Sequence, residues 1–533
     1  MNRKAGVVIG VIVIAGAAWT GAAWYTGKQA EQVVRQQIAE GNATLQTYVP
    51  NATLSLASLD RHLFSTDVRY RLQITQPATS EAAPREMDFI VVDHLSHGPL
   101  PLTEIKHGRL LPAMAASNFA LEPTDSAKPW FEAANGAVPL SGHARIGYGN
   151  GVTGVFTLAP VKVQQPETQL DFSGLNADFA VDGKSRATRV QAAVESLALK
   201  LENADDGADL AVSGLSLTSD MKPGASGLYL GTNTLNIKNT QVVLRDTPAL
   251  QLADYSQHAD VREDARGLAM RGQYDIGMVS YGGKELMGVQ FALGGLHLAP
   301  QAVKTLGRIN SDTVVQVMRA PAQSAAVPGG DAALQAQREE IVTAVQQILQ
   351  GNPSFFIGPL QLKNAKGVSS FDLTLDLTDP GDTEASLDDL VARTVRTFDA
   401  KLTLSTPMMA TTVSQILQAD GVDAAAADAH GQMVAQAIAA QAQATGFMTA
   451  AGDDVVAALQ YRDKVITLNG AQIPAQQFAA MVIGTAMSLA GAYGEGVAGD
   501  EPERAAPPAQ GSSGTQAAPP AGAQVAPKAA PRR

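Results

Sequence analysis

The chain has 533 residues, with 39 lysines and arginines against 51 aspartates and glutamates, for a formal net charge of −12. This acidic balance argues against nucleic acid as a partner, because a polyphosphate requires a basic face. The absence of cysteine excludes disulfides, thiolate metal sites and cysteine nucleophiles, and it is compatible with an oxidising compartment such as the periplasm.

The first 27 residues predict a membrane anchor. No charged residue occurs between Lys4 and Lys28, and residues 6–25 are long enough to cross a hydrocarbon layer of about 30 Å as a helix. Arg3 and Lys4 precede this run, which predicts a cytoplasmic N-terminus and a periplasmic bulk. The alternative is a cleaved signal peptide, whose apolar core is usually shorter, about 7 to 15 residues. We therefore expect a bacterial inner-membrane protein with a single retained span at residues 1–27.

The next part of the chain changes from a helical to a strand period. Residues 28–48 carry apolar side chains at helical spacing and predict a short stalk helix. Residues 49–330 predict a periplasmic β-rich region, because apolar and polar residues alternate there with a period of two. The alternation is clear at residues 68–74, 197–201, 215–217, 235–237 and 296–298, and it returns later at 371–377 and 402–404. Strict alternation between turn residues is typical of an antiparallel sheet with one wet face.

Residues 331–498 predict a mixed region in which helices join the strands. Asp331 is a suitable N-cap for a helix over residues 332–350, which Gly351 would end. Further helical patterns occupy residues 386–398, 408–417 and 424–451. The expected fold class is therefore α+β: an N-terminal transmembrane helix, then a long curved antiparallel β-sheet with helices packed on one face in the C-terminal half.

Residues 499–533 predict a disordered tail. Prolines recur there among alanine, glycine and glutamine, and such a composition cannot bury enough apolar surface to offset the entropy of ordering. The alternative is that the tail is a polyproline II ligand for a protein of the envelope.

A search for catalytic chemistry finds no convincing constellation. Residues 149–154 match the dinucleotide pattern G-x-G-x-x-G, but a β-type run follows where a helix is required, which favours a glycine-rich hairpin. His94, His97 and His107 are candidates for an imidazole cluster, although the glycine and proline that follow His97 favour a turn. No nucleophile lies near a base in a known pattern. We therefore expect no enzymatic activity, no cofactor and no metal.

Several short motifs resemble the YdgA family of uncharacterised Gram-negative inner-membrane proteins. They are residues 59–66 (LDRHLFST), 97–100 (HGPL), 295–303 (GLHLAPQAV), 356–360 (FIGPL), 367–377 and 465–470 (VITLNG). The family usually has a glycine after the arginine of the first motif, where this chain has His62 after Arg61, so the resemblance implies no glycine-dependent turn at that point. The family supplies no catalytic residues to carry over.

The expected function is envelope maintenance. An anchor followed by an elongated sheet is also similar in architecture to AsmA-type envelope proteins, and this resemblance implies a role in lipid movement or outer-membrane upkeep. An apolar sheet face could hold or conduct lipid, with Phe371, Leu373, Leu375 and Leu377 as the candidate lipid-facing residues. The alternative is a non-enzymatic periplasmic scaffold that binds another envelope protein through the sheet edge or the tail.

Overall fold

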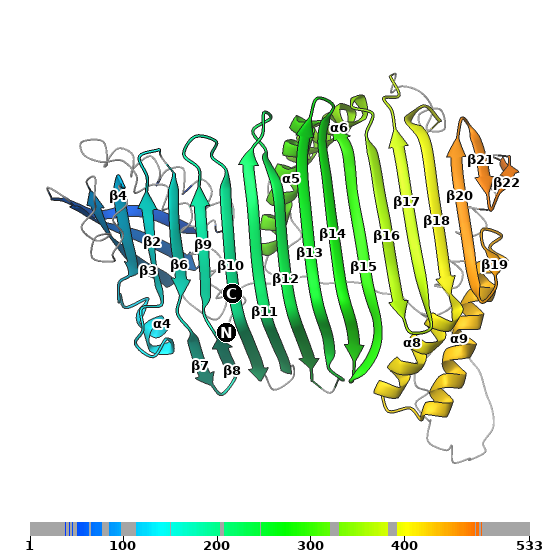
Figure 1. The fold of residues 1–533 in the computed structure, drawn as a ribbon, viewed down its shortest axis with the longest axis horizontal. Coiled ribbons are helices and arrows are strands. Elements are labelled where there is room, and N and C mark those ends of the chain that lie inside the picture. Colours follow the sequence, from blue (N-terminus) through cyan, green and yellow to red (C-terminus); the bar gives the residue numbers. More distant parts are fainter. Residues whose placement is uncertain are drawn as a thin grey trace, which may run out of the picture. The chain divides into compact units, whose positions relative to one another are not determined.

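A computed structural model of the protein describes most of the region between the predicted anchor and the predicted tail (Figure 1). The described residues are 51–62, 65–76, 85–97, 113–149, 151–202, 207–245, 247–319, 330–381, 392–474 and 476–478, with the single positions Ile38, Asn42, Leu45, Val49 and Met481. The predicted anchor (1–27) and tail (499–533) lie outside them. Within the described part of the chain, no helix combines the length and the apolar character needed to span a membrane.

The first half of the described chain is almost entirely strand. Its elements are β1 Ala52–Arg61, β2 Ser65–Gln76, β3 Arg85–His97, β4 Ala115–Leu121, α4 Lys128–Ala133, β5 Leu140–Ile146, β6 Val152–Leu158, β7 Val161–Gln165, β8 Thr168–Phe172, β9 Leu175–Val181, β10 Thr188–Glu202, β11 Gly207–Pro223, β12 Tyr229–Leu244, β13 Leu250–Asp264, β14 Gly267–Tyr281 and β15 Lys284–Leu298. The predicted alternation at residues 68–74 lies in β2, and that at 197–201 lies in β10.

Helices are inserted between the strands of the second half. The elements are α5 Pro300–Arg319, α6 Gly330–Gln350, β16 Ser354–Asn364, β17 Gly367–Leu377, β18 Val395–Ser405, α8 Thr406–Ala419, α9 Ala424–Ala444, β19 Thr449–Ala451, β20 Asp454–Arg462, β21 Val465–Leu468 and β22 Ala471–Ile473. The predicted helix at 332–350 is confirmed by α6. The predicted helix at 386–398 is wrong for its last four residues, which begin strand β18, and residues 386–391 lie outside the described part.

The strands form one long open antiparallel sheet, as predicted. Most strands pair with the next strand along the chain, which gives a meander (Figure 1). The chain departs from this order where β6 pairs with β9 around the inserted β7–β8 hairpin, and where β18 pairs with β20 around α8, α9 and β19. Because the sheet continues past each inserted helix, the fold class is mostly β with a few helices, rather than the expected α+β.

The apolar side of the first strands forms a sealed core. Val68, Tyr70 and Leu72 of β2 are almost fully buried, with Tyr70 only 2% exposed. Ile38 and Leu45, which are helical positions of the predicted stalk, belong to the same core cluster. The side chain of Asn42 accepts from the backbone N–H of Leu54 at 2.6 Å and donates to its carbonyl at 2.7 Å. The described part of the stalk region therefore packs on β1.

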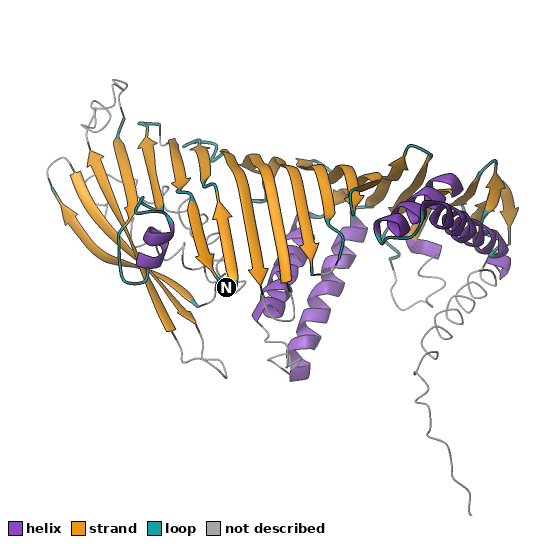
Figure 2. Ribbon diagram, turned by 90° about the horizontal axis from the view of Figure 1, so that it is seen from below, coloured by secondary structure: helices purple, strands orange, loops and turns teal. Residues whose placement is uncertain are grey.

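The helices of the second half do not cover the sheet in the expected way. Helix α8 lies across strand ends: Tyr281 donates to Asp420 at 3.1 Å, and Lys284 donates to Gln418 at 3.2 Å. Helices α5 and α6 pack on each other and are joined by an ion pair between Arg308 and Glu340. Both helices project outward from one side of the sheet (Figure 2). Neither the α5–α6 pair nor the α8–α9 pair lies flat along the long strands β10 to β13.

The apolar residues of β2 are buried, whereas those of β12 are only half-buried. Replacing a leucine by aspartate should therefore have different effects on stability in these two strands. Leu72→Asp places a charge in the sealed core, which typically costs several kcal/mol, so we expect it to unfold the full chain or to lower its melting temperature strongly. Leu235→Asp changes a half-buried residue of β12, where the carboxylate stays hydrated, so we expect a loss of about 1 kcal/mol. Equal losses, measured by circular dichroism during thermal and urea unfolding, would contradict this account.

Candidate functional site

A single row of directly opposed residues crosses the sheet from β1 to β20. In order it contains Leu59, Val68, Asp93, Phe119, Gly142, Phe156, Ala177, Ala192, Leu217, Leu235, Gln257, Tyr274, Phe291, Leu360, Phe371, Leu402 and Ala457. Directly opposed residues of antiparallel strands point to the same face of a sheet. The row therefore marks one continuous face, which we call the apolar face.

The apolar face is sealed at one end and half-open along the rest. In β2 and β3 it forms the buried core, whereas among the described residues of β10, β11, β12 and β13 no side chain is buried. Leu293 of β15, which follows Phe291 on this face, is 39% exposed. The open region is thus apolar but only partly covered, and it forms the main candidate site of the molecule.

The candidate lipid-facing residues lie on the apolar face. Phe371, Leu373 and Leu375 pair with Leu402, Ala400 and Phe398 of β18, and each of the three is half-buried. Leu377 pairs with Val395 after a shift of register. Their neighbours Asp372 and Thr374 are exposed, as strand alternation predicts, while Asp376 is half-buried.

Asp376 is held by its neighbours on β18. Thr397 donates a hydrogen bond to its carboxylate at 2.5 Å, and Arg396 lies 3.6 Å away. The hydrogen bond from Thr397 is the main reason that the pKa of Asp376 lies below its usual value. This carboxylate stays ionised and anchors β17 to β18 beside the apolar residues.

Two polar side chains interrupt the row, and the first is Asp93 in the sealed part. Its carboxyl group is 3% exposed and accepts a hydrogen bond from the Ser117 hydroxyl at 2.6 Å. Burial raises the pKa of Asp93 to about 6, against the lowering effects of the Ser117 hydrogen bond and of nearby His94. The buried Tyr70 has a raised pKa as well, from burial first and from Asp93 second.

The second interruption is Gln257 in the open part. It pairs with Leu235 on one side and with Tyr274 on the other. The Tyr255 hydroxyl donates to Gln257 Oε1 at 3.3 Å, and the Tyr274 ring stacks on Phe291 with 5.9 Å between centroids. The sequence pattern missed this group, because the residues of β13 do not alternate clearly between apolar and polar.

The other candidates from the sequence do not assemble into a site. His94 Nδ1 lies 2.6 Å from Asp67, and His62 Nε2 lies 3.3 Å from the same carboxylate. The His97 side chain and His107 lie outside the described residues, within which no cluster of three or more His, Asp or Glu side chains is arranged to hold a metal ion. The pattern at 149–154 leads into strand β6, which pairs with β5, so the predicted hairpin is confirmed.

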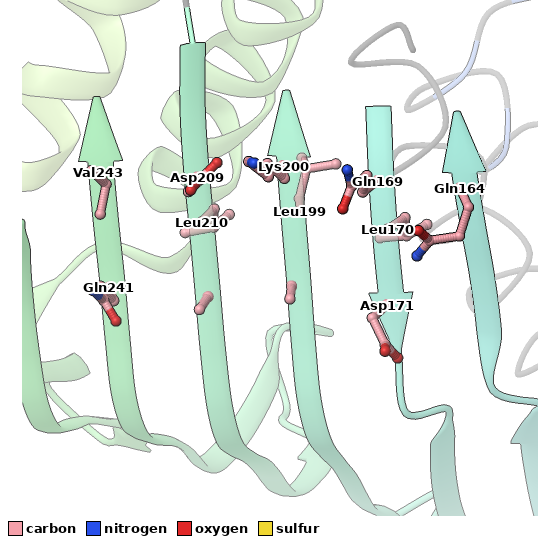
Figure 3. A pocket seen from close by; sticks show the side chains of 12 residues that line it. Gln164, Gln169, Leu170, Asp171, Leu199, Lys200, Asp209, Leu210, Gln241 and Val243 are labelled. Carbon is pink, nitrogen blue, oxygen red and sulfur yellow. The ribbon is translucent and has the colours of Figure 1, made fainter. Parts of the chain in front are cut away.

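Shallow hollows lined by both polar and apolar side chains lie on the opposite face of the sheet. The larger, of about 410 Å³, lies over β7, β8, β10, β11 and β12, with Ala198 and Ala211 among its lining residues (Figure 3). Lys200 at its rim pairs with Glu202. The smaller, of about 360 Å³, includes Arg189, which pairs with Asp220 at 2.6 Å. These charged side chains are exposed and paired with one another.

Comparisons with known proteins identify the family. Residues 1–476 match the profile of DUF945, described as a bacterial protein of unknown function, so the chain belongs to this family. It is 26% identical over 512 residues to Protein YdgA of Escherichia coli K12, across 92% of this chain and 98% of that protein. It is 24% identical over 490 residues to the uncharacterized protein YihF of the same strain, across 90% and 98%. The resemblance inferred from the motifs is confirmed, and no solved structure matches.

Asp93 predicts a pH dependence of stability. Its pKa is raised in the folded state, so folding favours the protonated carboxyl group, and this contribution is lost as the pH rises from about 4 through 6. We expect Asp93→Asn, which can still accept from Ser117, to raise the free energy of unfolding at pH 7.5 by about 2 kcal/mol and to remove most of this pH dependence. Urea unfolding between pH 4.5 and 7.5 measures both effects, with exposed Asp372→Asn as the control. A destabilised Asp93→Asn protein at pH 7.5 would refute this reading.

Proposed function

We propose that this DUF945 protein is a membrane-anchored periplasmic protein that serves envelope maintenance by holding or conducting lipid along its apolar face. The observation that supports the proposal is the continuity of that face. The side that forms a sealed core in β2 and β3 runs on, half-open, through β10 to β20. A contiguous and partly exposed apolar surface of this kind is typical of a ligand or interaction site.

The location is part of the proposal. The uncharged run at residues 6–25, preceded by Arg3 and Lys4, supports a single span in the bacterial inner membrane with the sheet in the periplasm. A sheet attached to the membrane in this way would receive lipid without the lipid crossing free water. The anchor and the apolar face thus support the same function from independent parts of the sequence.

The open face offsets part of the cost of holding a lipid outside the bilayer. Full burial of a methylene group contributes about 0.8 kcal/mol, and a methylene lying on one face is roughly half buried, so an acyl chain of about sixteen carbons gains on the order of 6 kcal/mol relative to water, about half of what the bilayer provides. This gain is moderate because the chain stays open to solvent on its outer side. Partial cover along a continuous face suits a surface on which a lipid moves as well as binds.

Site-specific photo-crosslinking in cells tests the proposal. A benzophenone amino acid in place of Leu373, on the apolar face, should give adducts whose added mass is that of a membrane lipid. The same group in place of the adjacent exposed Thr374, on the polar face, should give few or none, because neighbouring side chains of a strand point to opposite faces. Equal lipid labelling at both positions, or none at Leu373, would contradict the proposal.

The open edge of the sheet favours a second function, that of a scaffold. Among the described strands, β1 pairs only with β2. Asn42 already occupies the outer backbone groups of Leu54, so the part of this edge that can accept a strand from another envelope protein runs from Leu56 to Arg61. A benzophenone at the exposed position Asp60 of β1 would then capture a protein. Protein adducts at Asp60 together with an absence of lipid at Leu373 would favour the scaffold over the lipid surface.

A further inference from the structure

The open part of the apolar face contains one amide in its central row. From Ala192 to Ala457 the residues of the row are hydrocarbon or aromatic, except for Gln257 and the hydroxyl of its partner Tyr274. Both residues are half-buried. An acyl chain laid over these groups would remove their water, and an unmatched polar group in an apolar contact is costly.

Two hydrogen-bond donors on the apolar face have no protein acceptor among the described residues. Gln257 Oε1 is used by the Tyr255 hydroxyl at 3.3 Å. Among the hydrogen bonds of the described residues, none uses the Gln257 amide nitrogen or the Tyr274 hydroxyl. The Tyr274 ring is held between Phe291, on which it stacks, and Gly272, where a Cβ would lie only 3.5 Å from its hydroxyl oxygen.

The donors are uncharged, and so are their neighbours on this face. Leu235, Ile237 and Ile276 occupy the positions directly opposite Gln257 and Tyr255. No cation among these neighbours would neutralise a phosphate, so the matching acceptor is an uncharged oxygen. The group of this kind that lies next to the hydrocarbon of a membrane lipid is the carbonyl of its acyl ester.

We propose that Gln257 and Tyr274 donate hydrogen bonds to an ester carbonyl of the lipid held on the apolar face. This inference rests on the proposed lipid function and names the substrate class as acyl-ester lipids. The two donors fix where the ester lies along the sheet, and the apolar residues on either side receive the acyl chains. A lipid with ether-linked chains, which has no carbonyl, leaves both donors unmatched.

A competition between two lipids tests the inference. The full chain, with a benzophenone amino acid in place of Ile237, is reconstituted in vesicles that contain equal amounts of diacyl phosphatidylethanolamine and its diether analogue with the same chain length. Mass spectrometry of the adducts gives the ratio of ester to ether lipid. Two hydrogen bonds predict a preference for the ester of roughly tenfold.

Matched variants separate the possible results. Gln257→Leu combined with Tyr274→Phe should bring the ratio to about one while lipid capture persists. Gln251→Leu should leave the ratio unchanged, because Gln251 pairs with Gln241, which lines the hollow on the polar face. A wild-type ratio of one, or a preference that survives the double substitution, would overturn this inference alone. Capture of neither lipid by the wild-type chain would overturn the proposed function itself. Circular dichroism confirms that each variant is folded.

Discussion

The whole structure depends on one constraint: each strand must keep its apolar residues on the same side as those of its neighbour. In an antiparallel pair, a slip of one residue turns every side chain to the opposite face. The row from Leu59 to Ala457 shows that the register transfers this side from strand to strand without a reversal. A sheet built in this way has one apolar face along its full length, and that face is either covered by protein or left to bind something else.

The two polar interruptions of the row show how the degree of cover decides the chemistry of a side chain. Asp93 lies in the sealed core, so burial dominates and raises the pKa of its carboxyl group to about 6. Gln257 lies in the half-open part, where its amide can be hydrated or can meet a ligand. A polar residue in the row therefore affects stability where the face is sealed, as at Asp93, and is a candidate recognition group where the face is half-open, as at Gln257.

Much of the sheet could be predicted because period-two alternation is a local signal. The alternation at residues 68–74 and 371–377 correctly identified strands and their apolar sides. Local patterns failed where the spacing of apolar residues fits both a helix and a strand. Residues Val395 to Phe398 fit a helix but form a strand, because β18 pairs with both β17 and β20. The expected helix at 424–451 ends at Ala444, and the short strand β19 follows.

The candidate site was only partly visible in the sequence for a related reason. The four apolar residues of β17 alternate, so their shared face could be inferred, but their partners on β16 and β18 could not. Gln257 has no local signal, since its importance comes from its place between Leu235 and Tyr274 on other strands. The position of α8 across the strand ends likewise depends on contacts distant in the sequence, such as that between Tyr281 and Asp420.

The most direct test of the central claim is whether lipid acyl chains touch the open apolar face. Because the chain has no cysteine, a single bimane fluorophore can be attached at Leu217→Cys on this face or at the adjacent exposed position Thr218→Cys on the polar face. Reconstituted in vesicles whose acyl chains carry bromine, the protein labelled at 217 should be strongly quenched and the protein labelled at 218 should not. Equal quenching at the two positions, or none at 217, would contradict the account.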